Sequence, residues 1–153
     1  MKNPTLFVDI DGTIIKYRDF ANLITTEPEP IQEVVDFVNE QYDNGAVIII
    51  TTARPSDLEL FTKQDLEKIN LKYHQIVFDC GRGTRLLLND RDPEFPDSDR
   101  AIGVNFTRDR GFPDYFKLKV ALNEPTFQPI HYDKEKISNR TLLELVTEYY
   151  SKK

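Results

Sequence analysis

The sequence has few of the residues that build disulfide frameworks or zinc sites. Of its 153 residues, one is cysteine and two are histidine. Cys80 alone cannot form an internal disulfide, and after an apolar run a cysteine is more often a small buried hydrophobe than a nucleophile. His74 and His131 lie far apart, without cysteine or glutamate at zinc-ligand spacing. We therefore expect neither a disulfide-stapled secreted domain nor a zinc site.

An excess of positive charge and a long apolar run are also missing. The formal net charge is -6, and the 20 basic and 26 acidic residues are interspersed rather than blocked. This pattern predicts neither a nucleic-acid footprint nor a polybasic membrane patch, so an anionic substrate needs help from a local cation. No charged and then apolar leader precedes the first apolar run, and no run is long enough to cross a bilayer. We expect a cytoplasmic protein that contacts neither nucleic acid nor membrane.

The length and apolar content predict a single domain over residues 1–153. Hydrophobic residues make up 39% of the chain, and a chain of this size can bury a proper core. We find no internal repeat, low-complexity tract or linker that divides it.

Strands and helices alternate along the first half of the chain. Residues 5–8 and 46–50 are unbroken apolar runs, which are typical of buried strands. Apolar residues recur at helical spacing over 31–42 and over 57–69. Three further short apolar runs and two predicted helices follow, at 75–78, 85–88, 101–106, 115–122 and 139–150. Because parallel strands require long crossovers, the alternation predicts an α/β, three-layer Rossmann-like fold with a parallel central sheet and helices on both faces.

Two aspartates, Asp9 and Asp11, directly follow the first predicted strand. In an open parallel sheet, ligands collect at the carboxyl ends of the strands. Two carboxylates this close repel each other, and burial adds to the cost, so either a cation lies between them or one holds a proton. A hard divalent cation such as Mg²⁺ prefers carboxylate and carbonyl oxygens. Further polar residues end the later predicted strands: Thr51, Thr52, Asn89 and Asp90.

Three motifs at these strand ends carry a family resemblance. DIDGT at 9–13, IIITTARP at 48–55 and LLLND at 86–90 resemble, in order, the first, second and fourth motifs of the haloacid dehalogenase superfamily of phosphotransferases. The match covers roughly residues 5–110. Three motifs in order on successive strand ends are far more specific than DxDGT alone.

The resemblance implies roles for individual residues. Asp9 would attack a phosphate monoester and form an aspartyl-phosphate, while Asp11 would protonate the leaving oxygen and then activate water. Asp9, the backbone carbonyl of Asp11 and the carboxylate of Asp90 would bind Mg²⁺. Candidate phosphate-binding residues are Thr52, Thr51, Arg54, Arg82 and Gly12. Simpler alternatives stay open, because strand-end hydroxyls are common, Arg54 could pair with a loop carboxylate, and Asp90 could form an Asx-turn.

The chain departs from the family pattern at two positions. The third motif of the family is a lysine, and the segment before LLLND has none. Arg82 or Arg85 could replace it, and Arg82, between two glycines, is the better placed of the two; Lys63 is a weaker candidate. A guanidinium supplies the charge in a planar fork, so the exchange is not conservative. Asn89 stands where the fourth motif often has an acid.

The segment between Thr13 and the helix at Ile31 is too short for a cap domain. The chain is similar to small capless members associated with capsule and surface-sugar biosynthesis, so a small phosphorylated sugar is the expected substrate. Capless members often oligomerise, and a homo-oligomer is an open alternative here. Two other functions compete with this one. One is an inactive phosphate- or sugar-phosphate-binding protein. The other is a receiver-type signalling domain, in which the acidic residues follow different strands from those in this chain.

Overall fold

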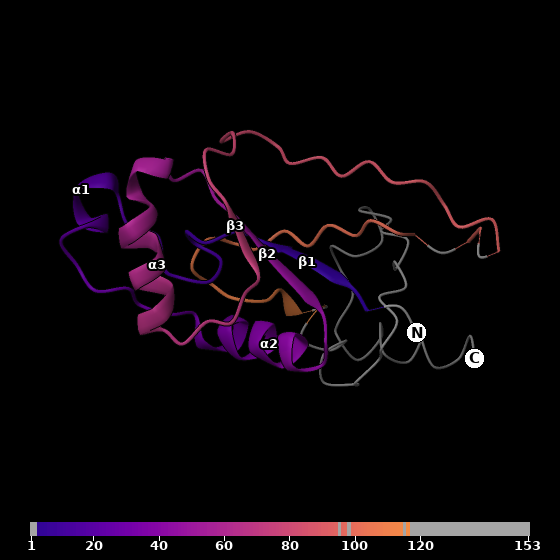
Figure 1. The fold of residues 1–153 in the computed structure, drawn as a ribbon, viewed down its shortest axis with the longest axis horizontal. Helices are drawn as coiled ribbons and strands as arrows, with labels where there is room; N and C mark the ends of the chain where they lie inside the picture. Colours follow the sequence, from indigo (N-terminus) through magenta and orange to yellow (C-terminus); the bar gives the residue numbers. More distant parts are fainter. Residues whose placement is uncertain (1–2, 95, 98, 115, 117–153) are drawn as a thin grey trace. The chain divides into compact units, whose positions relative to one another are not determined.

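The computed structural model describes residues 3–94, 96–97, 99–114 and 116 (Figure 1). The chain divides into two compact units. The first comprises Met1–Arg85 and Phe106–Phe112, and the second comprises Leu86–Asn105 and Pro113–Lys153. The single domain expected over 1–153 stays a prediction.

A parallel sheet of three strands lies at the centre of the first unit. Its strands are β1 (Thr5–Val8), β2 (Val47–Thr51) and β3 (Gln75–Val77), in the order β1-β2-β3. Both strand pairs are parallel. The predicted α/β class with a parallel sheet is therefore confirmed.

Helices form the connections between these strands. α2 (Gln32–Asp43) joins β1 to β2, while the 3₁₀ turn η1 (Ser56–Leu58) and α3 (Glu59–Lys68) join β2 to β3 (Figure 1). Gly45, with φ +90°, follows the end of α2 in a conformation that glycine adopts without steric cost. Both crossovers step in the same direction across the sheet, so right-handed connections place α2 and α3 on one face.

Burial alternates along β2 in agreement with this arrangement. Ile48 and Ile50 are fully buried, whereas Val47 is 40% exposed. Phe7, the register partner of Ile49 on β1, is 51% exposed. The helices that the structure describes, α2 and α3, thus account for the burial of one face of the sheet. The predicted helix over 139–150, and that over 115–122 except for Phe116, lie outside the described residues.

Residues 13–30 form the flap, a short excursion between β1 and α2. Isolated bridges pair Asp11 with Ile15 and Ile15 with Pro30, and the short helix α1 (Phe20–Leu23) is capped by Asp19. As the length of the segment predicts, residues 13–30, all of which the structure describes, contain no cap domain. Within the described residues, no helix is long and apolar enough to cross a membrane.

Two predicted strands are wrong. Neither 85–88 nor 101–106 forms a strand in the structure. Leu86 and Leu88 are 76% and 83% exposed. A four-residue apolar run becomes a strand only where a neighbouring strand supplies hydrogen-bond partners, and periodicity does not report such a partner.

Candidate functional site

The chain turns sharply where β1 ends, and this turn positions both aspartates. Ile10, which is fully buried, accepts hydrogen bonds through its carbonyl from the backbone N–H groups of Thr13 (3.2 Å) and Ile14 (2.9 Å). Gly12 lies in the turn with φ +83°, which would strain any other residue. The Asp-Ile-Asp-Gly sequence therefore holds Asp9 and Asp11 at the carboxyl end of the sheet. The role of Gly12 is to adopt the positive φ that this turn requires.

Asp9 is a partly buried carboxylate with a cationic neighbour. Its side chain is 30% exposed, and Oδ1 accepts a hydrogen bond from Arg85 Nη2 at 3.0 Å. Thr13 Oγ1 lies 3.4 Å from Oδ2. Burial raises the pKa of Asp9; Arg85 lowers it, the charge of Asp11 raises it, and the net change is upward. A carboxylate whose charged form is destabilised in this way is typical of a functional site.

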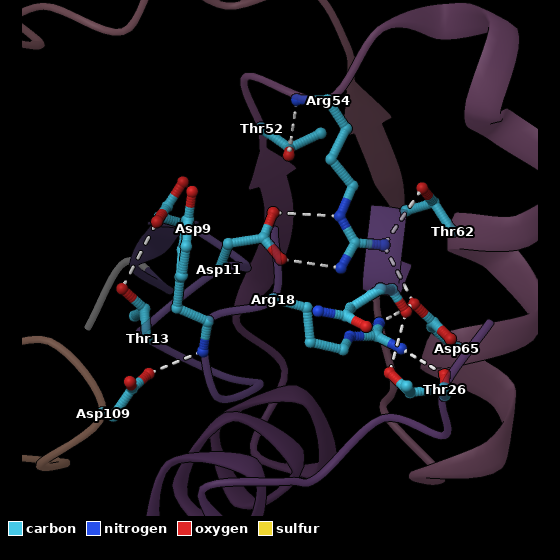
Figure 2. A network of polar contacts seen from close by, with 12 residues as sticks. Asp9, Asp11, Thr13, Arg18, Thr26, Thr52, Arg54, Thr62, Asp65 and Asp109 are labelled. Carbon is cyan, nitrogen blue, oxygen red and sulfur yellow. Dashed lines mark hydrogen bonds and ion pairs between the residues drawn. The ribbon is translucent and has the colours of Figure 1, made fainter. Parts of the chain in front are cut away.

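Asp11 is bound by a different arginine. Arg54 Nε donates to Asp11 Oδ2 at 2.9 Å, and Nη2 donates to Oδ1 at 2.7 Å (Figure 2). Arg54 itself is only 4% exposed. Burial alone would lower the pKa of Arg54, but the hydrogen bonds and charges of Asp11 and Asp65 outweigh it and raise the pKa. The two neighbouring acids thus have separate cationic partners.

The opposite edge of Arg54 faces α3. Nη1 donates to Asp65 Oδ2 at 3.0 Å and to Thr62 Oγ1 at 3.2 Å. Asp65 also pairs with Arg18, which belongs to the flap and donates through Nη1 to the carbonyl of Thr26 at 2.6 Å (Figure 2). Asp11, Arg54, Asp65 and Arg18 form an alternating chain of charges that we call the buried charge network.

The buried charge network includes Arg54, which the sequence predicted as a phosphate-binding residue. Every guanidinium nitrogen of Arg54 binds a protein oxygen. The geometry favours the alternative in which Arg54 pairs with carboxylates. Sequence reasoning missed Asp65 and Arg18; the available signal was an acid on the inward face of α3, between Thr62 and Leu66, both fully buried.

The two threonines end β2 close to these groups. Thr52 is fully buried, and its Oγ1 accepts a hydrogen bond from the backbone N–H of Arg54 at 3.1 Å. Its hydroxyl proton is still available for donation. The carbonyl of Thr51 lies 3.5 Å from Arg85 Nη2. Thr52 therefore shapes the turn that carries Arg54, and Thr51 lies near the arginine that contacts Asp9.

The structure distinguishes the two arginines considered as replacements for the lysine. Arg85 reaches Asp9. Arg82 is exposed, and its side chain makes no ion pair or hydrogen bond within the described residues. The preference for Arg82 on sequence grounds is not supported by this geometry, because residue spacing alone did not show which side chain turns toward β1.

Asp90 belongs to the second unit. Its carboxylate is 77% exposed and accepts a hydrogen bond from Arg100 Nη1 at 2.8 Å. Asn89 Nδ2 donates to the carbonyl of the same arginine at 3.2 Å. The contribution of Asp90 to a metal site stays a prediction.

Two oxygen groups in the first unit have the chemistry that a magnesium ion accepts. The carboxylate of Asp9 and the backbone carbonyl of Asp11, which accepts no hydrogen bond from the described residues, are hard oxygen donors that fit Mg²⁺. In the part of the chain that the structure describes, no group of three or more His, Cys, Asp or Glu side chains could hold a metal ion. The magnesium site therefore stays a prediction.

A distant segment, residues 106–112, docks on the same turn. The backbone N–H of Asp109 donates to the carbonyl of Gly12 at 3.0 Å, and Asp109 Oδ1 accepts from the N–H of Tyr17 at 2.6 Å (Figure 2). At the other end, the N–H of Phe112 donates to Glu33 Oε1 at 2.7 Å. The predicted strand over 101–106 ends where this segment begins, and no sequence signal indicated that residues 106–112 border the flap.

Comparisons with known proteins add little to this geometry. No protein-family model matches the chain, and no curated protein matches it. Among solved structures, the chain is similar to a target protein from Vibrio cholerae, with 19% sequence identity and a TM-score of 0.42. The match covers 63% of this chain and 89% of the other. A likeness of this degree carries no argument about function.

Proposed function

We propose that this chain is a capless phosphatase of the haloacid dehalogenase type that hydrolyses a small phosphate monoester, a phosphorylated sugar being the expected substrate. The observation that carries the proposal is Asp9. It lies at the carboxyl end of a parallel strand, burial disfavours its charged form, and a cation contacts it. A nucleophilic carboxylate must be ionised, and the nearby cation favours that form.

Asp9 is the proposed nucleophile on phosphorus, and Asp11 is the proposed acid and base. Arg54 binds one lone pair on each oxygen of Asp11 and so fixes the plane of the carboxylate. No residue that the structure describes binds the second lone pair on either oxygen. The arrangement supports an Asp11 whose orientation is set before substrate arrives.

Arg85 supplies positive charge where the phosphoryl group would meet Asp9. Its contact with Asp9 Oδ1 supports a role in binding phosphoryl oxygens, the role that a lysine has in the family pattern. Bound Mg²⁺, held by Asp9 and the carbonyl of Asp11, would neutralise further negative charge during phosphoryl transfer. We include in the proposal a cytoplasmic location, for which the single cysteine and the net charge of -6 are the grounds.

A second candidate is a phosphate- or sugar-phosphate-binding protein without turnover. The ion pair between Arg85 and Asp9 favours it, because the pair occupies one oxygen of the proposed nucleophile. Asn89 also favours the binding protein, because its amide lacks the negative charge of the acid that the fourth motif often has at this position.

Turnover of p-nitrophenyl phosphate by the purified full chain, with and without Mg²⁺, distinguishes these functions. A panel of hexose phosphates follows on the same protein, and Asp9→Asn is the control. Hydrolysis that requires Mg²⁺ and disappears in Asp9→Asn supports the phosphatase. Calorimetric binding of a hexose phosphate with no hydrolysis supports the binding protein. Neither hydrolysis nor binding across the panel would overturn both.

A further inference from the structure

Arg108 places an exposed guanidinium beside the turn that carries the two aspartates. A methyl group built on Gly12 would lie 2.9 Å from Arg108 Cγ, so the stem of the arginine lies against the backbone directly after Asp11. The guanidinium carbon lies 4.3 Å from the centroid of the Tyr17 ring on the flap. This cation–π contact restricts the direction of a side chain that is otherwise long and flexible.

The hydrogen bonds that hold this segment beside the flap come from Asp109 and not from the side chain of Arg108. Backbone and carboxylate groups of Asp109 make the hydrogen bonds that dock residues 106–112 on Gly12 and Tyr17. Arg108 is exposed, and it forms no ion pair with any residue that the structure describes. In contrast, Arg18, Arg54 and Arg85 each bind a carboxylate. Arg108 is therefore a cation with its hydrogen-bonding edge available, in a chain of net charge -6.

We propose that Arg108 is a specificity-determining residue that binds a second anionic group, a carboxylate or a further phosphate, on the leaving group of the substrate. The proposal rests on the proposed function and names its substrate class. Asp9 would receive the phosphate that is transferred, and the fork of Arg108 would bind the second anion across Gly12. Planar, two-point binding of carboxylate or phosphate is the recognition for which arginine is suited.

A comparison of three substrates on the full chain tests this proposal. p-Nitrophenyl phosphate carries no second anion, a hexose bisphosphate carries a second phosphate, and phosphogluconate carries a carboxylate. Arg108→Ala is expected to raise KM for one or both of the doubly anionic substrates by about tenfold to a hundredfold, the range of a lost charge-assisted contact. KM for p-nitrophenyl phosphate is expected to stay within about twofold. Which substrate responds shows whether the second anion is phosphate or carboxylate.

Two further variants separate recognition from folding. Arg110→Ala is the matched control, because Arg110 is an exposed arginine on the same segment, and it should leave all three KM values unchanged. Tyr17→Phe keeps the ring beneath the guanidinium and should behave as wild type. An equal change for all three substrates in Arg108→Ala, or the same selective loss in Arg110→Ala, would overturn the proposal.

Binding to Asp9→Asn separates this proposal from the phosphatase function. Calorimetry compares phosphogluconate and a hexose bisphosphate with a hexose monophosphate, in Asp9→Asn alone and in combination with Arg108→Ala. Tighter binding of a doubly anionic ligand that depends on Arg108 supports the inference even if the parent chain hydrolyses nothing. Hydrolysis by the parent chain without any preference that depends on Arg108 supports the phosphatase and overturns the inference.

Discussion

Arg54 and Asp11 form a two-point ion pair in which Nε lies 2.9 Å from Oδ2 and Nη2 lies 2.7 Å from Oδ1. The aspartate comes from the end of β1 and the arginine from the end of β2. Their side chains are 21% and 2% exposed. Removing one partner of a buried ion pair is expensive, because the other charge is left without a partner. The pair therefore ties the orientation of a proposed catalytic acid to the stability of the fold.

Replacement of Arg54 should reveal this dependence. Arg54→Ala leaves Asp11 and Asp65 without their shared cation, and we expect the free energy of unfolding to fall by about 3–5 kcal/mol. Arg54→Lys should recover only part of this lost stability, because an ammonium cannot bind two carboxylates in a planar fork. Urea denaturation measures both. Lys63→Ala, which removes an exposed pair with Glu59, is the matched control and should leave the urea midpoint at the wild-type value. A wild-type midpoint for Arg54→Ala would contradict the prediction.

Asp65 should act on turnover through Arg54 rather than by touching substrate. Asp65→Asn keeps the shape but removes the charge that Arg18 and Arg54 share. We expect kcat for p-nitrophenyl phosphate to fall about tenfold or more, since positioning of the acid affects the reaction step, with KM changed by less than about threefold. Steady-state kinetics at a temperature well below the unfolding transition provides both values.

The outcome for Asp65 can be separated from a general loss of structure. Asp36→Asn makes the same exchange of carboxylate for amide at an exposed position on α2, and it is the matched control. If Asp65→Asn raises KM and leaves kcat intact, the network does not position Asp11.

The architecture could be predicted because its signals are local. Residues 5–8 and 46–50 are continuous apolar runs, and the helical periods between them require parallel crossovers. The location of Asp9, Asp11 and Thr52 at one edge of the sheet then follows from topology. Local patterns fail for 85–88, where an apolar run has no strand to pair with in the described structure.

The partners of the charged residues could not be predicted in the same way. Arg54 and Asp11 are 43 residues apart, and Arg18 and Asp65 are 47 apart. Each pairing depends on where the flap and α3 come to lie, which no short pattern encodes. The contact of Tyr17 with Asp109, 92 residues away, depends on a docked loop rather than on a strand. The backbone framework of the site was therefore predictable, and its ion pairs were not.

The raised pKa of Asp9 predicts a pH-dependent gain in stability for Asp9→Asn. In the folded chain Asp9 binds its proton more tightly than in the unfolded chain, because burial disfavours the charge. Stability from this group is complete below its ordinary pKa of 3.8 and is lost as pH rises through the raised folded pKa. At neutral pH the charge is a cost, so Asp9→Asn should unfold at a higher urea concentration than wild type.

The difference between the two urea midpoints, followed from acid to neutral pH, checks the prediction about Asp9. The gap should widen as pH rises and then level off, and titrating groups far from Asp9 cancel because both proteins contain them. A gap of the same size at every pH would mean that a cause other than the buried charge stabilises the variant.

Arg85 and Arg82 provide the sharpest comparison at the site. Arg85→Ala removes the cation that contacts Asp9, so kcat/KM for p-nitrophenyl phosphate should fall about a hundredfold or more, the scale expected when a charge that stabilises the transition state is lost. Arg85→Lys should retain part of the activity, because the ammonium keeps the positive charge but lacks the planar fork. Arg82→Ala, a neighbour without a described partner, is the matched control and should be close to wild type. The opposite result, with loss in Arg82→Ala and not in Arg85→Ala, would mean that the contact between Arg85 and Asp9 does not persist when substrate binds, and that Arg82 is the cation at this site.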